Sequence, residues 1–158
     1  MNWQSWLLWG FVATIALTTL SAGAQGAGLT RMSFPEVLGL AVTPSRDKAK
    51  LYGFLLHVGL GLVYSLIYVA IFESAHLANW WIGGLIGLAQ ALFVLIVVMT
   101  LLPSVHPRMA SEHYGPTAKR VLEPPGMMAL HYGVQTPLAV IASHVAFGVI
   151  LGAFYHLR

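Results

Sequence analysis

The sequence predicts an all-α membrane protein: a four-helix bundle of two tandem two-helix repeats, with a short interfacial helix and a structured cytoplasmic loop. The first observation is composition, because 58% of the 158 residues are apolar and only 8% are charged, against about 25% charged residues in soluble domains. The second is a set of four apolar stretches of membrane-spanning length. The third is an internal similarity between the second and fourth stretches. The length predicts one domain, residues 1–158.

The four apolar stretches define the predicted spans. A hydrocarbon core of about 30 Å requires roughly 20 apolar residues in a helix. The first stretch is interpreted as a retained helix and not as a cleaved signal peptide, because no Lys or Arg precedes Arg31. The predicted spans are about 3–24, 49–72, 80–102 and 130–156, with connecting loops at 25–48 and 103–129.

The internal similarity aligns Leu51–Tyr68 with Leu138–Tyr155 without a gap. The shift is 87 residues (144 minus 57), which places His57 on His144. We interpret the match as duplication of a two-helix unit, the alternative being coincidence among apolar residues. A duplication of this kind implies a pseudo-twofold axis along the membrane normal, with both histidines facing the centre. The shift also aligns Gly61 with Gly148, Tyr68 with Tyr155, and Glu36 with Glu123.

The distribution of basic residues predicts the orientation. Six of the eight Lys and Arg residues lie in the two long loops, and Lys50 lies at the loop end of the second span. Only Arg158 lies at the other side. Because cytoplasmic loops carry the excess of positive charge, we expect both long loops in the cytoplasm and both termini outside, in a bacterial inner membrane. The net charge of +3 is explained by this bias, so no nucleic-acid partner is predicted.

The two long loops carry local structure signals. Ser33 and Glu36 have the spacing of a capping box, which predicts a short interfacial helix over Phe34–Val42. Thr43-Pro44 ends that helix. The second loop holds five of the eight prolines and is rich in His, Met and Tyr. We expect it to fold back over the cytoplasmic end of the bundle.

Small residues recur at every fourth position in three spans, a spacing that lets helix backbones approach closely in lipid. We expect the three rows to face one another, and such grooves also suit self-association or contact with other membrane subunits. The rows consist of Gly53, Gly61 and Ser65 in the second span, Gly83 and Gly87 in the third, and Gly148 and Gly152 in the fourth.

His57 and His144 are the first candidate site residues, because ionisable side chains within spans are costly and usually face a partner. One interpretation makes them cofactor ligands, either as axial imidazoles of a haem b or as two ligands of a transition metal. The other interpretation is that each neutral imidazole makes an interhelical hydrogen bond.

A second candidate site is a metal site formed by His106, Glu112, His113 and His131, in or beside the second long loop. Nitrogen and carboxylate ligands of this kind suit Zn, Cu, Fe or Ni. No pair has a stringent motif spacing, so contacts of a folded loop are the alternative. The chain has no cysteine, which excludes disulfides and thiolate sites.

The runs TPSRDKAKLYGFLLHVGLGLVYSLIYVAIFE, LLPSVHPRMASE and LEPPG are followed in the fourth span by the pattern H-x-x-x-G-x-x-x-G-x-x-Y. Together they resemble a family of uncharacterised bacterial four-helix membrane proteins, the YqhR-like proteins. The resemblance covers about Phe34 to Tyr155 and implies the four-span fold. That family carries no assigned activity, so the resemblance implies no role for any residue.

The predicted function is that of a non-catalytic accessory or scaffold subunit that acts through helix packing in the lipid bilayer. The first alternative is a haem- or metal-binding redox protein that uses His57 and His144. The second alternative is a small transporter or channel.

Overall fold

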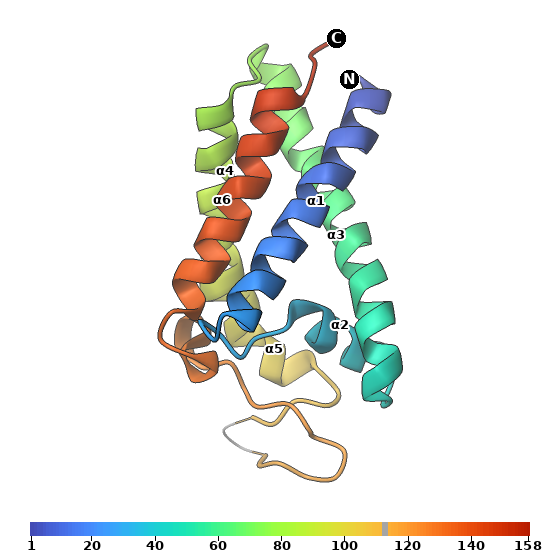
Figure 1. Ribbon diagram of the computed structural model, residues 1–158, viewed down its shortest axis with the longest axis vertical. Coiled ribbons are helices and arrows are strands. Elements are labelled where there is room, and N and C mark those ends of the chain that lie inside the picture. The colour runs from blue at the N-terminus through green and yellow to red at the C-terminus, as the bar shows by residue number, and fades with distance from the viewer. Residues whose placement is uncertain (112–113) are drawn as a thin grey trace.

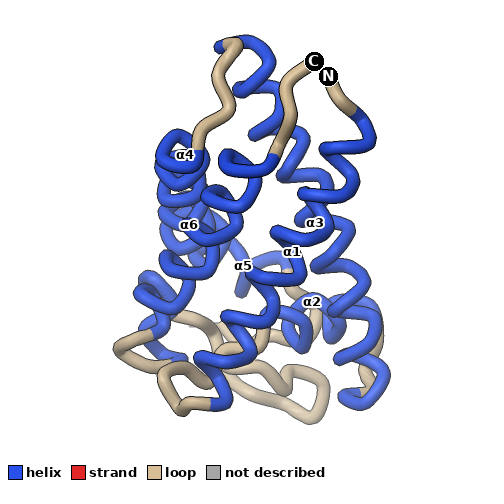
Figure 2. The backbone as a smooth tube through the Cα atoms, turned by 45° about the horizontal axis from the view of Figure 1, so that its top comes forward, coloured by secondary structure: helices blue, strands red, loops and turns tan. Residues whose placement is uncertain are grey.

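The computed structural model describes residues 1–111 and 114–158 and confirms the predicted all-α four-helix bundle. Four segments are long and apolar enough to cross a membrane, and they pack side by side (Figure 1). Both termini lie at one end of the bundle (Figures 1 and 2). In chain order the elements are α1 (Trp3–Gly26), α2 (Phe34–Val42), α3 (Arg46–Ala75), α4 (Trp80–Phe93), the π-helix η1 (Val94–Val98), α5 (Met99–Val105), the 3-10 helix η2 (Met127–Tyr132) and α6 (Thr136–Phe154).

Side-chain caps explain where four of these helices begin. The free N–H groups of a first turn require acceptors, which Ser and Asn side chains supply. Ser33 accepts from the amide of Glu36, so α2 has the predicted cap and the predicted bounds, Phe34–Val42. The other capping side chains belong to Asn2 for α1, Ser45 for α3 and Asn79 for α4.

The fourth span begins at Thr136, later than the predicted residue 130. The preceding segment is η2, which is bounded by Gly126 and Gly133 with φ angles of 67° and 130°. These angles lie in a region that side chains with a Cβ rarely adopt, so they separate η2 from α6. Pro137 then occupies the first turn of α6, where its missing N–H has no cost.

Glycines bring α4 and α6 into backbone contact. A methyl group on Gly83 would overlap the Gly148 carbonyl oxygen, and one on Gly148 would overlap the Gly83 carbonyl oxygen. Gly87 faces the His144 carbonyl oxygen in the same way, and Gly152 faces that of Asn79. The two rows therefore face each other as expected.

The row on α3 faces elsewhere, and the prediction that all three rows meet is wrong for this helix. Gly53 lies against the backbone of Pro35 in α2, and Gly61 lies against Thr14 of α1. Ser65 accepts a 2.8 Å hydrogen bond from the indole N–H of Trp6. The α3 row therefore packs on α1 and α2, because these elements occupy that face of the helix.

Helix α4 packs mainly on α6, and α3 packs mainly on α2. Helices α3 and α4 therefore have little direct contact along their length. The Tyr68 hydroxyl spans the gap and donates to Gln90 Oε1 at 2.5 Å. Beyond Gln90 the third span becomes π-helical, with the Met99 amide bonded to the Val94 carbonyl. A π-helical turn shifts the register of the side chains that follow it.

The segment after α5 folds back onto α2, which confirms the expected structured loop. The His106 ring donates from Nε2 to the Val37 carbonyl at 2.9 Å, and the Arg108 guanidinium donates to the Leu40 carbonyl. The loop thus holds α2 against the lower end of α3. The assignment of this end to the cytoplasm stays a prediction.

The tandem duplication also stays a prediction. The regions before the two matched spans differ in the structure, since α2 is a nine-residue α-helix and η2 is a six-residue 3-10 helix. Within η2, Met128 and Ala129 have φ angles of 53° and 61°.

Candidate functional site

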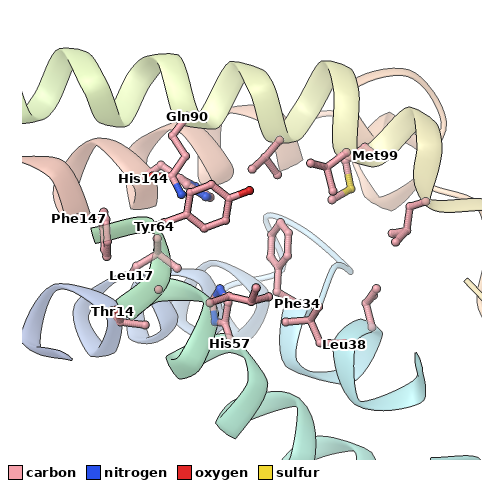
Figure 3. A pocket seen from close by; sticks show the side chains of 16 residues that line it. Thr14, Leu17, Phe34, Leu38, His57, Tyr64, Gln90, Met99, His144 and Phe147 are labelled. Carbon is pink, nitrogen blue, oxygen red and sulfur yellow. The ribbon is translucent and has the colours of Figure 1, made fainter. Parts of the chain in front are cut away.

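A cavity of about 300 Å³ lies inside the bundle, in the gap between α3 and α4 (Figure 3). All four spans line it, and α2 closes it toward the lower end of the molecule in Figure 1. Its walls are mainly apolar, and each of the four spans adds at least one polar side chain. Thr14 of α1 donates its hydroxyl to the Gly10 carbonyl of its own helix. His57 and Tyr64 belong to α3, Gln90 to α4 and His144 to α6. The structure therefore places the two predicted histidines on one cavity.

The hydrogen bonds of His57 determine its tautomer. Its Nδ1 lies 3.1 Å from the Thr18 hydroxyl oxygen. The Thr18 hydroxyl hydrogen is already donated to the Thr14 carbonyl at 2.8 Å. With its hydrogen directed to that carbonyl, the Thr18 oxygen accepts from His57, and this arrangement favours the tautomer with the ring proton on Nδ1. Nε2 of a neutral His57 is then an unprotonated acceptor.

His144 has the same arrangement on the other side of the cavity. Its Nδ1 lies 2.8 Å from the Val140 carbonyl oxygen, which can only accept a hydrogen bond. The proton is therefore on Nδ1, and Nε2 carries the lone pair. Both rings are thus held by their Nδ1–H groups, from helices on different sides of the cavity.

Neither Nε2 atom has a hydrogen-bond partner within residues 1–111 and 114–158. The described part of the chain also contains no inaccessible side-chain nitrogen or oxygen that lacks a partner. An unpartnered Nε2 is therefore accessible, and the cavity is the space that His57 and His144 line. The cavity consequently presents two acceptors, one from α3 and one from α6.

Tyr64 and Gln90 add hydrogen-bond donors. The Tyr64 hydroxyl, which lines the cavity, has no partner among the described residues. The Gln90 oxygen accepts from Tyr68, so its NH₂ group is free to donate. Together with the two histidines, they give the apolar cavity two acceptors and at least two donors.

Two apolar side chains define the edges of the cavity. Leu60 lines it and is also 42% exposed, so the cavity reaches the outer surface of the bundle beside α3. Phe34 of α2 stacks on the His57 ring, with centroids 6.0 Å apart and an interplanar angle of 5°. A molecule dissolved in the bilayer could enter beside Leu60 without crossing water.

The two described histidines of the predicted metal site on the second loop, His106 and His131, bond to the backbone. Both His106 ring nitrogens are occupied, because Nδ1 accepts from the Arg108 amide at 3.1 Å while Nε2 donates to Val37. Burial lowers the pKa of His106, which keeps the ring neutral and suited to this bridging role. His131 is exposed and pairs with the Pro124 carbonyl. Glu112 and His113 lie outside the described residues.

Residues 1–111 and 114–158 contain no group of three His, Cys, Asp or Glu side chains that could hold a metal ion. His57 and His144 are thus a pair without a third ligand of these types.

From the sequence, Tyr64 and Gln90 were considered only as hydrogen-bond partners of the two histidines. Their place in the lining of a cavity was missed, as was that of the π-helical residues Val94 and Val98. Gln90 offered a signal, since an amide in the middle of a membrane span requires a partner. Tyr64 offered a weaker one, at seven residues beyond His57 on the same helix face. The π-helix gives no signal in an apolar run.

No family model, no curated protein and no solved structure matches the chain. The fold and composition indicate a membrane protein, since four helices are long and apolar enough to cross a bilayer.

Proposed function

We propose that the protein binds a lipid-soluble quinone or its quinol inside the membrane, in the cavity between His57 and His144. The observation that supports this most is the presentation of two unprotonated Nε2 atoms to one apolar cavity from helices α3 and α6.

The polar atoms of the cavity complement both oxidation states of such a ligand. A quinol has a hydroxyl at each end of its ring, and each hydroxyl needs an acceptor when buried. His57 and His144 supply one acceptor each. A quinone has carbonyl oxygens at the same positions, and the Tyr64 hydroxyl and the Gln90 amide are free donors.

Size and access support the same ligand class. Ligand pockets are mostly apolar with a few placed polar groups and measure roughly 300–1,000 Å³. The cavity of about 300 Å³ suits a single substituted ring. Its opening beside the exposed Leu60 provides a path for an apolar tail to remain in the bilayer.

Haem b is the second candidate, and one observation favours it. Metal-binding histidines usually donate their other ring N–H to the protein, as both histidines do here. A haem is larger than the cavity, so Phe34 would have to rotate away from His57. A bare metal ion fits less well, because structural and catalytic metal sites need three or four protein ligands and the described residues offer this pair no third one.

The roles of accessory subunit, transporter and channel stay predictions. Most glycines of the predicted packing rows contact other helices of the same chain, either between α4 and α6 or between α3 and its neighbours, and so are not free to contact another subunit. A transport path would need water, whereas most of the side chains that line this cavity are apolar.

Tyr64→Phe tests the proposal at a residue whose removal leaves no other group unpaired. Its hydroxyl has no protein partner in the described chain, so the variant should fold as the wild type does. We expect it to weaken binding of a short-tailed quinone by about tenfold, as the loss of one hydrogen bond to a buried carbonyl implies. Fluorescence titration of the detergent-purified protein measures the change.

Tyr52→Phe is the matched control, because Tyr52 lies on the outer face of α3 and does not line the cavity. Equal quinone affinity in the wild type, Tyr64→Phe and Tyr52→Phe would contradict the proposed contact. A Soret band in the native protein that disappears in His57→Ala and His144→Ala would identify the ligand as haem b and not a quinone.

A further inference from the structure

The outer face of α3 carries an apolar groove of about 480 Å³. Its lining residues on α3 recur every three or four positions, which places them on one face of the helix. The lining consists of Val42, Tyr52, Leu55, Leu56, Gly59, Leu60 and Val63. From Tyr52 to Val63 the helix rises about 16 Å at 1.5 Å per residue. That length matches half of a hydrocarbon core of about 30 Å, the depth of one leaflet.

A separate pocket of about 380 Å³ lies at the lower end of the same helix. Two of its lining residues, Arg108 and Lys119, are cations, and none of those lining residues is acidic. Pro44, which also lines it, immediately precedes Ser45, the N-cap of α3. The N-terminal end of α3 therefore lies beside the two cationic side chains, and Asp47 in the first turn of α3 offsets the positive end of its dipole.

The groove and the basic pocket adjoin. Val42 lines the first and Pro44 lines the second, and residues two apart in the chain lie within about 7 Å. A basic pocket and an apolar groove about one leaflet long are thus lined by residues two positions apart in the chain.

The charges at this end are not fully balanced by acidic side chains. Glu123 pairs with Arg31, and Glu36 pairs with Arg46. In the described chain, Lys119 has no carboxylate within salt-bridge distance, and the guanidinium of Arg108 donates only to the Leu40 carbonyl. As far as residues 1–111 and 114–158 show, both cations are therefore available to an external anion.

From these features we propose that the basic pocket and the α3 groove together bind one anionic phospholipid of the adjacent leaflet. The phosphate of the headgroup lies between Arg108 and Lys119, and one acyl chain lies along Tyr52, Leu56 and Gly59. Clusters of Lys and Arg next to a span attract anionic lipids electrostatically. Apolar contact along the groove adds the second, independent part of the recognition.

Native mass spectrometry of the full-length protein in detergent, titrated with phosphatidylglycerol or phosphatidylcholine, tests this site. We expect one phosphatidylglycerol to bind at least tenfold more tightly than phosphatidylcholine. Lys119→Gln should weaken phosphatidylglycerol binding about fivefold, as the loss of one cation implies. Lys50→Gln is the matched control, since Lys50 is exposed at the same end but lines neither the pocket nor the groove.

Gly59→Leu tests the acyl-chain part. A Cβ on Gly59 meets nothing within 4 Å, so the larger side chain fills the groove without disturbing the fold. We expect this variant to weaken phosphatidylglycerol binding as well. Equal affinity for the two lipids, an effect of Lys50→Gln as large as that of Lys119→Gln, or no effect of Gly59→Leu would each overturn the proposal. Competition by inorganic phosphate at the same concentration as the lipid would also overturn it, because the site would then bind a free anion.

Discussion

Gly83→Ala is expected to destabilise the protein strongly, because it adds a methyl group where two spans are in backbone contact. The new Cβ would overlap the Gly148 carbonyl oxygen, which belongs to helix backbone and cannot rotate away. Helices α4 and α6 would have to separate, and overpacking of this kind costs about 3 kcal/mol. For a chain of this size we expect a fall of about 10 °C in the thermal unfolding midpoint, or loss of monodisperse protein. Thermal unfolding in detergent measures the effect.

Gly59→Ala is the matched control for this prediction. The substitution is the same and the residue is again a membrane-helix glycine, but the added Cβ meets nothing within 4 Å. Alanine is also the better helix former by about 1 kcal/mol. The control should therefore unfold at or above the wild-type temperature. Equal unfolding temperatures for Gly83→Ala and Gly59→Ala would contradict the assigned α4–α6 contact.

Much of the fold could be predicted because its determinants are local. Apolar length defines the spans, and the Ser33 cap defines the start of α2. The mutual contact of Gly83 and Gly148 follows from their spacing, because small residues four apart allow close backbone approach. These signals depend on neighbouring residues in the chain and need no knowledge of the tertiary structure.

The rotation of each helix about its axis could not be predicted in the same way. Gly61 was expected to face the other glycine rows, and instead it packs against Thr14 of α1. Lipid tails are as apolar as the side chains of these helices, so any face of an apolar helix can contact lipid. The pattern of apolar residues therefore does not specify which face turns inward.

Of the polar side chains in the candidate site, only His57 and His144 were predicted as site residues from the sequence. Their placement on one cavity depends on α3 and α4 diverging, and on η1 directing Val94 and Val98 inward. Tyr64 and Gln90 become significant only when that cavity exists. The roles of His57 and His144 as ligands of a bound molecule stay a prediction.

His57→Leu and His144→Leu are each expected to weaken quinol binding by about tenfold or more. Each substitution removes one Nε2 acceptor and leaves a buried quinol hydroxyl unpaired, which costs about 1–3 kcal/mol. A quinone carbonyl cannot donate to Nε2, so quinone binding should change much less. Titration of each variant with the oxidised and the reduced form of one short-tailed ligand measures the difference.

Both histidine variants should fold. The Thr18 hydroxyl keeps its bond to the Thr14 carbonyl, and the Val140 carbonyl remains within the hydrogen bonding of α6. His156→Ala is the control, because His156 is exposed beyond the end of α6 and does not line the cavity. Equal losses of quinone and quinol affinity would contradict the acceptor role of the two rings.

The most direct measurement is organic extraction and mass spectrometry of the natively purified protein. The proposed function predicts a prenylated quinone in an amount close to one molecule per chain, and a strong reduction when His57→Leu and His144→Leu are combined. Quinone at the same level as in an unrelated membrane protein purified in the same detergent would contradict it.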